Sequence, residues 1–367
     1  MENQGLLDKH DEQPKKNKRI KGLLIGLGGV VILCILAIVF VFYRDKIIKP
    51  VGAQGIIVFE SDGDIYSIKP NGRDLKNLTE SEFKEYDPQI SPDGQYVAFV
   101  SDRDDGIGLY IVGKNGEGLR KVSGSISSIS QTNYLWSPDS QSIIYESSRY
   151  SRNEDGGSIV DNSFFITSVQ NQDSELIYQD GSNSLETNFL WSKDGKYIYI
   201  SGDYSIIRLT LENLETQSID VDFQISKLIS LSPDGETLFY EDPSSVVYSV
   251  DVNGENNRYL DKFISDSGIC WSADGKYIYY GVNNGDLMRL LMTESEEPEV
   301  FVPSGDGRYN VEVACSPDGK WLAYIDVAEY EYEVDAWDNI RELRLLKFSN
   351  GSTYFVTDFG SSPYWGQ

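Results

Sequence analysis

Aspartate and glutamate are the residues that could act as catalytic groups in this chain of 367 residues, because histidine is nearly absent. The one histidine, His10, precedes a long apolar run, and the sequence after residue 50 contains none. A Ser-His-Asp triad, a Cys-His dyad and a His-ligated zinc or haem site therefore cannot be built there. Two converging carboxylates suffice to hydrolyse a glycosidic bond. The sequence thus predicts a protein that is not an enzyme, with a carbohydrate-active or lyase-type enzyme that uses paired carboxylates as the alternative.

Three aspartates, Asp102, Asp104 and Asp105, form a candidate metal site ahead of Gly106. Carboxylate oxygens are ligands that Ca²⁺ prefers, but the spacing of a calcium loop with its closing glutamate is missing. The aspartates follow a predicted strand, where Asp and Gly are ordinary turn residues. We expect a structural turn and no cofactor here, with a Ca²⁺ site as the alternative.

Two enlarged loops are the candidate partner-binding sites. The first runs from Arg149 to Asn162, and the second carries alternating Glu and Tyr within residues 329–337. Alternation places the acids on one face of a strand and the rings on the other, which suits a cationic peptide. Loops longer than those of sibling repeats often carry function, and a solvated hairpin or a disordered excursion is the alternative. The candidate residues are Arg152, Glu154, Asp155, Glu329, Tyr330, Glu331, Tyr332, Glu333 and Trp337.

A repeated phrase of four residues indicates the elements that position these side chains. Ser, a variable residue, Asp and usually Gly recur six times, 40 to 55 residues apart. Such a phrase forms a tight turn, and its aspartate is expected to cap the loop through side-chain hydrogen bonds. Short runs rich in β-branched and aromatic residues follow each turn and predict strands. The six serines are Ser91, Ser137, Ser192, Ser232, Ser272 and Ser316.

Four short strands in each unit of about 40 residues predict an all-β protein with the β-propeller fold. The six turns give six blades. Residues 56–78 supply a blade without its innermost strand, and residues 362–366 supply a strand without a blade. Joined, they complete a seventh blade and remove the exposed sheet edges. We therefore predict seven four-stranded blades closed by the C-terminal strand, with six blades as the alternative.

The segment from Asp87 to Arg103 reads Asp-Pro-Gln-Ile-Ser-Pro-Asp-Gly-Gln-Tyr-Val-Ala-Phe-Val-Ser-Asp-Arg and resembles the WD40-like repeat of TolB-like β-propeller proteins. It is also similar to the propellers of dipeptidyl peptidase IV relatives. The resemblance covers roughly residues 55–367 and implies the fold, but little about function, because propellers host unrelated activities. Those peptidases carry a hydrolase domain with a Gly-x-Ser-x-Gly elbow, and no such motif follows the repeats.

An uncharged apolar run, 23–43, is long enough to span a bilayer as one helix. More basic side chains precede it than follow it, so the positive-inside rule places the N-terminus in the cytoplasm and the propeller outside. A cleaved signal peptide and a lipidated Cys34 are the alternatives. We predict a basic cytoplasmic tail over 1–22, a transmembrane helix over 23–43, a stalk over 44–55 and an extracytoplasmic propeller over 56–367.

The predicted propeller is strongly acidic, because residues 50–367 carry 23 basic and 53 acidic side chains. The negative electrostatic field of these side chains disfavours binding of nucleic acid and anionic polymers and favours cationic partners. The alternative is that the acidic side chains only keep the surface solvated. Cys270 and Cys315 occupy matching places on the innermost strands of adjacent blades. Since those strands are not normally hydrogen-bonded to each other, we expect two small buried side chains rather than a disulfide.

Together these features predict a single-pass bacterial membrane protein that acts as a non-catalytic protein-binding or scaffolding module at the cell envelope. The expected partner is an envelope protein or peptide, and the acidic surface favours a cationic one. Binding would use one rim of the ring and the mouth of its central channel. An envelope sensor for a small ligand is a further alternative.

Overall fold

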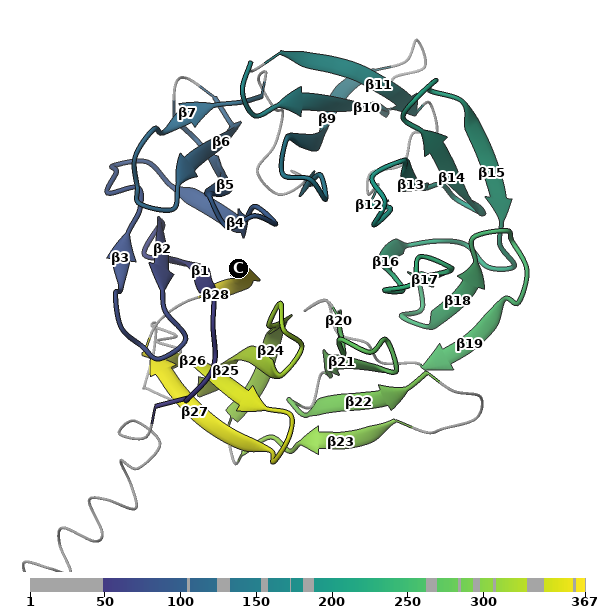
Figure 1. Cartoon of the computed structure of the whole chain (residues 1–367). Coiled ribbons are helices and arrows are strands. Elements are labelled where there is room, and N and C mark those ends of the chain that lie inside the picture. Colours follow the sequence, from purple (N-terminus) through teal and green to yellow (C-terminus); the bar gives the residue numbers. More distant parts are fainter. Residues whose placement is uncertain are drawn as a thin grey trace, which may run out of the picture. The chain divides into compact units, whose positions relative to one another are not determined.

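The computed structural model describes residues 49–103, 106–123, 133–152, 158–171, 173–180, 188–261, 269–282, 285–292, 298–305, 308–328, 340–358 and 361–366. Within these ranges every regular element is a β-strand, and the strands form seven four-stranded sheets. The sheets stand around a central channel as the blades of a propeller (Figure 1). The prediction of an all-β propeller with seven blades is therefore confirmed.

Each blade is an antiparallel sheet whose first strand lies nearest the channel (Figure 1). From the innermost strand outward, the blades are β28 (Ser361–Gly366), β1 (Ile56–Ser61), β2 (Asp64–Ile68) and β3 (Lys76–Asn77); β4 (Glu85–Ile90), β5 (Tyr96–Ser101), β6 (Gly108–Gly113) and β7 (Arg120–Lys121); β8 (Tyr134–Trp136), β9 (Ser142–Arg152), β10 (Ser158–Ser168) and β11 (Ser174–Asp180); β12 (Phe189–Trp191), β13 (Tyr197–Ser201), β14 (Ser205–Thr210) and β15 (Thr216–Asp220); β16 (Lys227–Leu231), β17 (Thr237–Glu241), β18 (Val247–Asp251) and β19 (Arg258–Asp261); β20 (Ile269–Trp271), β21 (Tyr277–Gly281), β22 (Leu287–Leu291) and β23 (Glu299–Val302); and β24 (Arg308–Cys315), β25 (Trp321–Ala328), β26 (Ile340–Lys347) and β27 (Ser352–Thr357).

Strand order gives the ring two distinct faces. The turns after the third strands, and after the first strands of blades 2 to 7, lie on one face, which we call the turn face. Two such turns meet in blade 2, where Lys114 donates its backbone N–H to the Gln95 carbonyl at 2.9 Å. The hairpins after the second strands and the links between blades lie on the other, the hairpin face. There Ile225, in the link between blades 4 and 5, donates to the Asp203 carbonyl at 2.7 Å in a hairpin.

The repeated turns are built as the sequence predicts. In all six, the serine hydroxyl donates to the aspartate two residues later, at 2.5–2.8 Å. The same hydroxyl oxygen accepts a backbone N–H five residues on, as Ser232 does from Thr237 at 2.9 Å. The bond from Ser232 lowers the pKa of Asp234, so this carboxylate stays ionised and the loop stays capped.

The hydrophobic core lies between neighbouring blades. Between blades 4 and 5, for example, Ile206 and Tyr199 pack against Leu238 and Tyr240. Most of the buried side chains are apolar or aromatic, and their removal from water is the main force that stacks the sheets.

The two ends of the propeller close the ring in blade 1. β28 pairs antiparallel with β1, with Trp365 opposite Ile57, and the Trp365 indole donates to the Gln54 carbonyl at 2.8 Å. Gly55 has a φ of 91°, and a Cβ at this position would lie 2.1 Å from the Gly366 carbonyl oxygen. Glycine is needed for this approach, because any larger side chain would push the two strands apart. The predicted closure by the C-terminal strand is confirmed.

The expectation of two separate cysteines is wrong. Cys270 on β20 and Cys315 on β24 form a disulfide, with their Cα atoms 5.6 Å apart. A disulfide requires proximity and facing Cβ atoms but no hydrogen bond between the strands. Innermost strands converge on the channel, so adjacent blades come close enough there without being paired.

The predicted loop from Arg149 to Asn162 is also corrected. β9 and β10 continue through most of it as a long hairpin, with Arg149 opposite Asp161 and Arg152 opposite Ser158. The extended pairing satisfies backbone groups that a loop would leave to water. Residues 153–157 lie outside the described ranges.

No helix in the described ranges is long and apolar enough to cross a membrane. The predicted tail and transmembrane segment, 1–22 and 23–43, fall outside those ranges, and the description begins at residue 49, within the predicted stalk.

Candidate functional site

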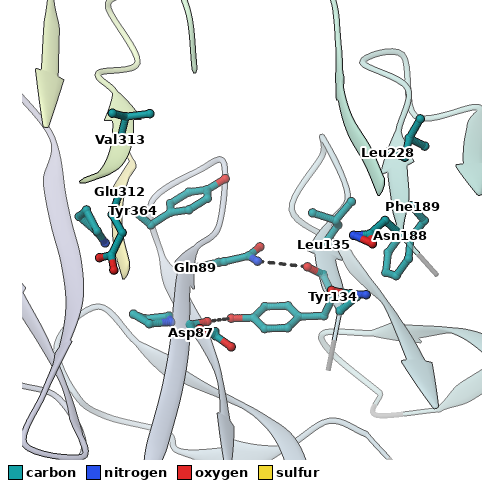
Figure 2. Close-up of a pocket in the computed structure, with 13 residues that line it drawn as sticks. Asp87, Gln89, Tyr134, Leu135, Asn188, Phe189, Leu228, Glu312, Val313 and Tyr364 are labelled. Carbon is teal, nitrogen blue, oxygen red and sulfur yellow. Dashed lines mark hydrogen bonds between the residues drawn. The ribbon is translucent and has the colours of Figure 1, made fainter. Parts of the chain in front are cut away.

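A cavity of about 490 Å³ lies in the channel among the innermost strands (Figure 2). Its wall comes from β4, β8, β12, β16, β24 and β28, so most of the blades contribute. The innermost strands start where the links between blades end, at the hairpin face. Asn133 and Asn188 directly precede β8 and β12, and Leu228 is the second residue of β16, so the cavity lies toward the hairpin face. The lining is mixed, with carboxyl, amide and phenol groups beside apolar side chains.

Two β-bulges turn carboxyl groups toward this cavity. The register of β4 shifts between Tyr86 and Gln89, and Asp87 in the bulge has a φ of 50°. The register of β24 shifts in the same way, and Glu312 in its bulge has a φ of 54°. Left-handed backbone is unfavourable for residues other than glycine and is often found at functional sites. The bulges re-aim Asp87 and Glu312, and Figure 2 shows both on one side of the cavity.

Glu60, near the end of β1, is electrostatically coupled to these two acids. Burial, with repulsion from Asp87 and Glu312, raises the pKa of Glu60 to about 7, and the Arg341 guanidinium opposes the rise. Burial also raises the pKa of Asp87. Arg341 on β26 lies 3.4 Å from the Glu312 carboxylate. We call Glu60, Asp87 and Glu312 the carboxyl cluster, and Arg341 acts on two of its members, Glu60 and Glu312.

Two tyrosines complete the wall near the cluster. The Tyr134 hydroxyl contacts the Asp87 carbonyl and lies 3.0 Å from the Ala98 carbonyl, and Gln89 donates to the Tyr134 carbonyl at 3.1 Å (Figure 2). Burial raises the pKa of Tyr134, so this phenol keeps its proton at neutral pH. Tyr134 is a fixed part of the wall, whereas Tyr364 is 40% exposed and offers a ring to a ligand.

This arrangement suits two kinds of chemistry. Excess carboxylates beside an exposed ring attract a cationic group. A carboxyl group whose pKa lies near 7 can also donate or accept a proton at neutral pH. Within the described ranges, no three His, Cys, Asp or Glu residues are grouped so that they could hold a metal ion.

Two of the predicted site residues, Asp102 and Arg152, are described, and neither lines this cavity. Asp102 accepts the Lys84 backbone N–H at 2.9 Å in an exposed turn. Arg152 is exposed at the end of β9 and does not line the cavity. The other predicted metal and partner residues lie outside the described ranges: Asp104, Asp105, Glu154, Asp155, Glu329, Tyr330, Glu331, Tyr332, Glu333 and Trp337.

Sequence reasoning missed the carboxyl cluster. One signal was available at Asp87, because Pro88 follows it within a predicted strand and proline inside a strand marks a bulge or an edge. Glu312 and Glu60 look like ordinary polar residues of alternating strands, and no local pattern joins positions so far apart in the chain.

Among known sequences, no protein-family model matches the chain. An uncharacterized protein of Agrobacterium fabrum is 28% identical over 142 residues, which cover 36% of this chain and 48% of that protein. The uncharacterized peptidase YuxL of Bacillus subtilis is 29% identical over 178 residues, 48% of this chain and 24% of the peptidase. The matched segments thus span about half and about a quarter of these curated relatives.

Among solved structures, TolB from Acinetobacter baumannii has a TM-score of 0.50 at 14% identity, over 87% of this chain and 68% of TolB. An oligogalacturonate lyase from Vibrio parahaemolyticus has a TM-score of 0.53 at 14% identity, over 83% and 87% of the two chains. A functionally unknown protein from Desulfotomaculum acetoxidans has a TM-score of 0.58 at 14% identity, over 86% and 99%.

These structural relatives differ in activity, and identities this low show a shared fold alone. The names cover a TolB and a lyase, so the comparisons leave enzyme and non-enzyme roles both open. With four-stranded blades, a repeated Ser-x-Asp turn and closure by the C-terminal strand, the described chain is a seven-bladed β-propeller whose fold is similar to that of TolB.

Proposed function

We propose that this propeller is a non-catalytic binding module of the bacterial cell envelope whose channel mouth takes a cationic segment of a partner protein or peptide. The observation that carries the proposal is the carboxyl cluster in the channel cavity. A lysine or arginine side chain that entered the cavity would meet Asp87 and Glu312 in its wall, and Glu60 is electrostatically coupled to both. Its charge would replace the repulsion among the acids with attraction.

Several features support the choice of partner. The cavity of about 490 Å³ has room for a few side chains but not for a folded domain, so an extended segment fits it best. The acidic excess of residues 50–367 would steer a cation toward it and repel nucleic acid. A cation beside Glu60 would also lower the pKa of that acid, so binding should tighten as the pH rises through 7.

Two features support a location of the propeller outside the cytoplasm: the apolar run near the N-terminus and the disulfide. We keep the apolar run 23–43 as a single membrane anchor with a cytoplasmic N-terminus and an extracytoplasmic propeller. The bond between Cys270 and Cys315 supports an oxidising compartment, because disulfides are rare in the cytosol.

The proposal is tested by photocrosslinking the full-length chain in living cells. A photoreactive amino acid replaces Tyr364 in the channel or, as the control, Lys193 on the turn face. We expect discrete envelope proteins to be captured from position 364 and not from position 193, and capture to fall when E60Q, D87N and E312Q are combined. Equal capture from both positions, or capture that the three substitutions leave intact, would contradict the proposal.

An enzyme with paired carboxylates is the second candidate, because burial and repulsion from Asp87 raise the pKa of Glu60 to about 7. Glu60 would act as general acid and Asp87 as base or nucleophile on a neutral glycan, since the acids would repel a polyanionic one. Incubation with neutral oligosaccharides tests this role. Product release that E60Q and D87N abolish, while E117Q on the turn face leaves it unchanged, would establish an enzyme in place of the binding module.

A further inference from the structure

Exposed aromatic rings gather on the hairpin face of blades 4 and 5. Tyr259 is 62% exposed, Tyr204 60% and Phe223 44%. Tyr204 lies in the hairpin of blade 4 and Phe223 in the link between the blades. Tyr259 is the second residue of β19 and lies opposite Tyr248 near the start of β18. Large rings held in water beside one another are unusual and mark interaction surfaces.

Phe223, Tyr248 and Tyr259 form one cluster, which we call the rim corner. The ring of Phe223 stacks on Tyr248, with centroids 4.3 Å apart and planes 18° from parallel. Tyr259 meets Tyr248 nearly edge-on, at 6.3 Å and 81°. Because Tyr248 is only 7% exposed and stacks on Tyr240 at 5.4 Å, the corner rests on the core. The two exposed rings are therefore steeply inclined to each other on a firm base.

The link that carries Phe223 is fixed to its neighbours. Val221 donates its backbone N–H to the Tyr204 carbonyl at 3.2 Å, and Ile225 donates to the Asp203 carbonyl at 2.7 Å. Val221 and Ile225 are both buried in the core between the blades. Phe223 is thus presented between two anchored residues, so little order has to be gained when a ligand binds.

A carboxylate is fixed beside the corner. Asp242 accepts the backbone N–H groups of Ser244 at 2.8 Å and Val246 at 3.0 Å through one oxygen. Its other oxygen lies 3.4 Å from the Tyr248 hydroxyl. Asp203 and Asp222 are exposed in the same hairpin and link. Arg258, the basic residue next to Tyr259, points to the opposite side of β19 by strand alternation.

We infer that the rim corner is a second binding site, independent of the channel, that takes a lysine or arginine side chain of a partner protein. A cation is attracted to the faces of aromatic rings, and two inclined rings can both contact one cationic head. The Asp242 carboxylate supplies the opposite charge at the edge of the corner. A flat sugar ring would need one broad platform, and an anionic ligand would be repelled by the acids.

Hydroxyl-radical footprinting of the full-length chain, with and without hexalysine, tests the inference residue by residue. We expect hexalysine to protect Phe223 and Tyr259 and to leave Leu75 and Leu119, which are exposed on the turn face, unchanged. Protection should persist in the channel variant that combines E60Q, D87N and E312Q, so the two proposals can fail separately. F223L/Y259L should weaken binding of hexalysine about tenfold, and D242N several-fold.

The leucine variant keeps apolar bulk and loses only the ring faces, so it separates recognition from folding. The control L75A/L119A removes exposed apolar area on the turn face and should leave binding unchanged. Absence of protection by millimolar hexalysine would overturn the inference. Protection by neutral cellohexaose in place of hexalysine would also overturn it and identify a glycan platform instead.

Discussion

Glu60 illustrates how position, rather than residue type, decides what a side chain does. It sits near the end of an ordinary strand, yet burial and two neighbouring acids raise its pKa to about 7. Its neighbours Asp87 and Glu312 are aimed by bulges that belong to other blades. The ionised form of Glu60 is unfavourable in the folded protein, so this residue destabilises the fold at high pH. The same ionised carboxylate contributes to a site that attracts cations.

The first prediction concerns the pH dependence of stability at Glu60. Its folded pKa lies above the unfolded value, so the folded state binds the extra proton, and stability falls as the pH rises from about 4.5 through 7. Glu60→Gln should therefore raise the free energy of unfolding by about 1–2 kcal/mol at pH 8 and by much less at pH 5, after discounting for partial exposure.

Urea denaturation at the two pH values measures this difference. Glu117→Gln, exposed on the turn face, should change stability by less than about 0.5 kcal/mol at either pH. An equal gain from E60Q at pH 5 and pH 8 would refute the assignment of the raised pKa.

At the scale of elements, the repeated turn is the unit from which the blades are built. Each buried serine both donates to its aspartate and accepts from the start of the next strand, so one hydroxyl sets the turn and the strand register together. These groups were predictable because the chemistry is local. The innermost strands were less predictable, because the register shifts in the pairing of four of them, β4, β16, β24 and β28, and a local signal such as Pro88 in β4 does not accompany every shift.

The second prediction tests one such turn. Ser232→Ala removes both hydrogen bonds of a side chain that is only 8% exposed, and should lower the free energy of unfolding by about 1–2 kcal/mol. Ser218 also donates to an aspartate two residues later, at 3.1 Å, but it is exposed. Ser218→Ala should cost less than about 0.5 kcal/mol. Equal losses in urea denaturation would refute the structural role of the buried turn serine.

The third prediction concerns the disulfide, which ties the innermost strands of two adjacent blades. Cys270 and Cys315 are 45 residues apart, and closing a loop of this length is expected to stabilise the fold by about 3–4 kcal/mol. The double variant C270A/C315A should lose this stability in urea denaturation. A reducing agent should destabilise the original chain and leave the double variant unchanged; no effect of reduction on the original chain would contradict the bond.

At the scale of the whole molecule, ring closure joins residues more than 300 positions apart, as in the bond from Trp365 to Gln54. The closure leaves no free sheet edge at the seam, and the approach depends on glycine at position 55. The ring also fixes the positions of the proposed sites, because strand direction puts the channel mouth and the rim corner toward the same hairpin face. One extended cationic partner could therefore contact both.

The fourth prediction tests this seam. Gly55→Ala adds a Cβ 2.1 Å from the Gly366 carbonyl oxygen, in addition to the strain of a φ of 91°, and should destabilise the propeller by more than about 3 kcal/mol. Gly235→Ala is the matched control, because its φ is 81° but the space around it is open. It should cost about 1 kcal/mol. Similar losses in thermal unfolding would show that the close approach at the seam is not needed.

The sequence by itself determined the fold class, the seven blades and the closing strand, because turn chemistry, strand alternation and the repeat are local and recur along the chain. It also excluded histidine chemistry from the propeller, since composition needs no coordinates. Only the tertiary structure decided that Cys270 and Cys315 are bonded and that Glu60, Asp87 and Glu312 interact. These residues are distant in sequence, and only the curvature of the ring and the bulges in its inner strands bring them together.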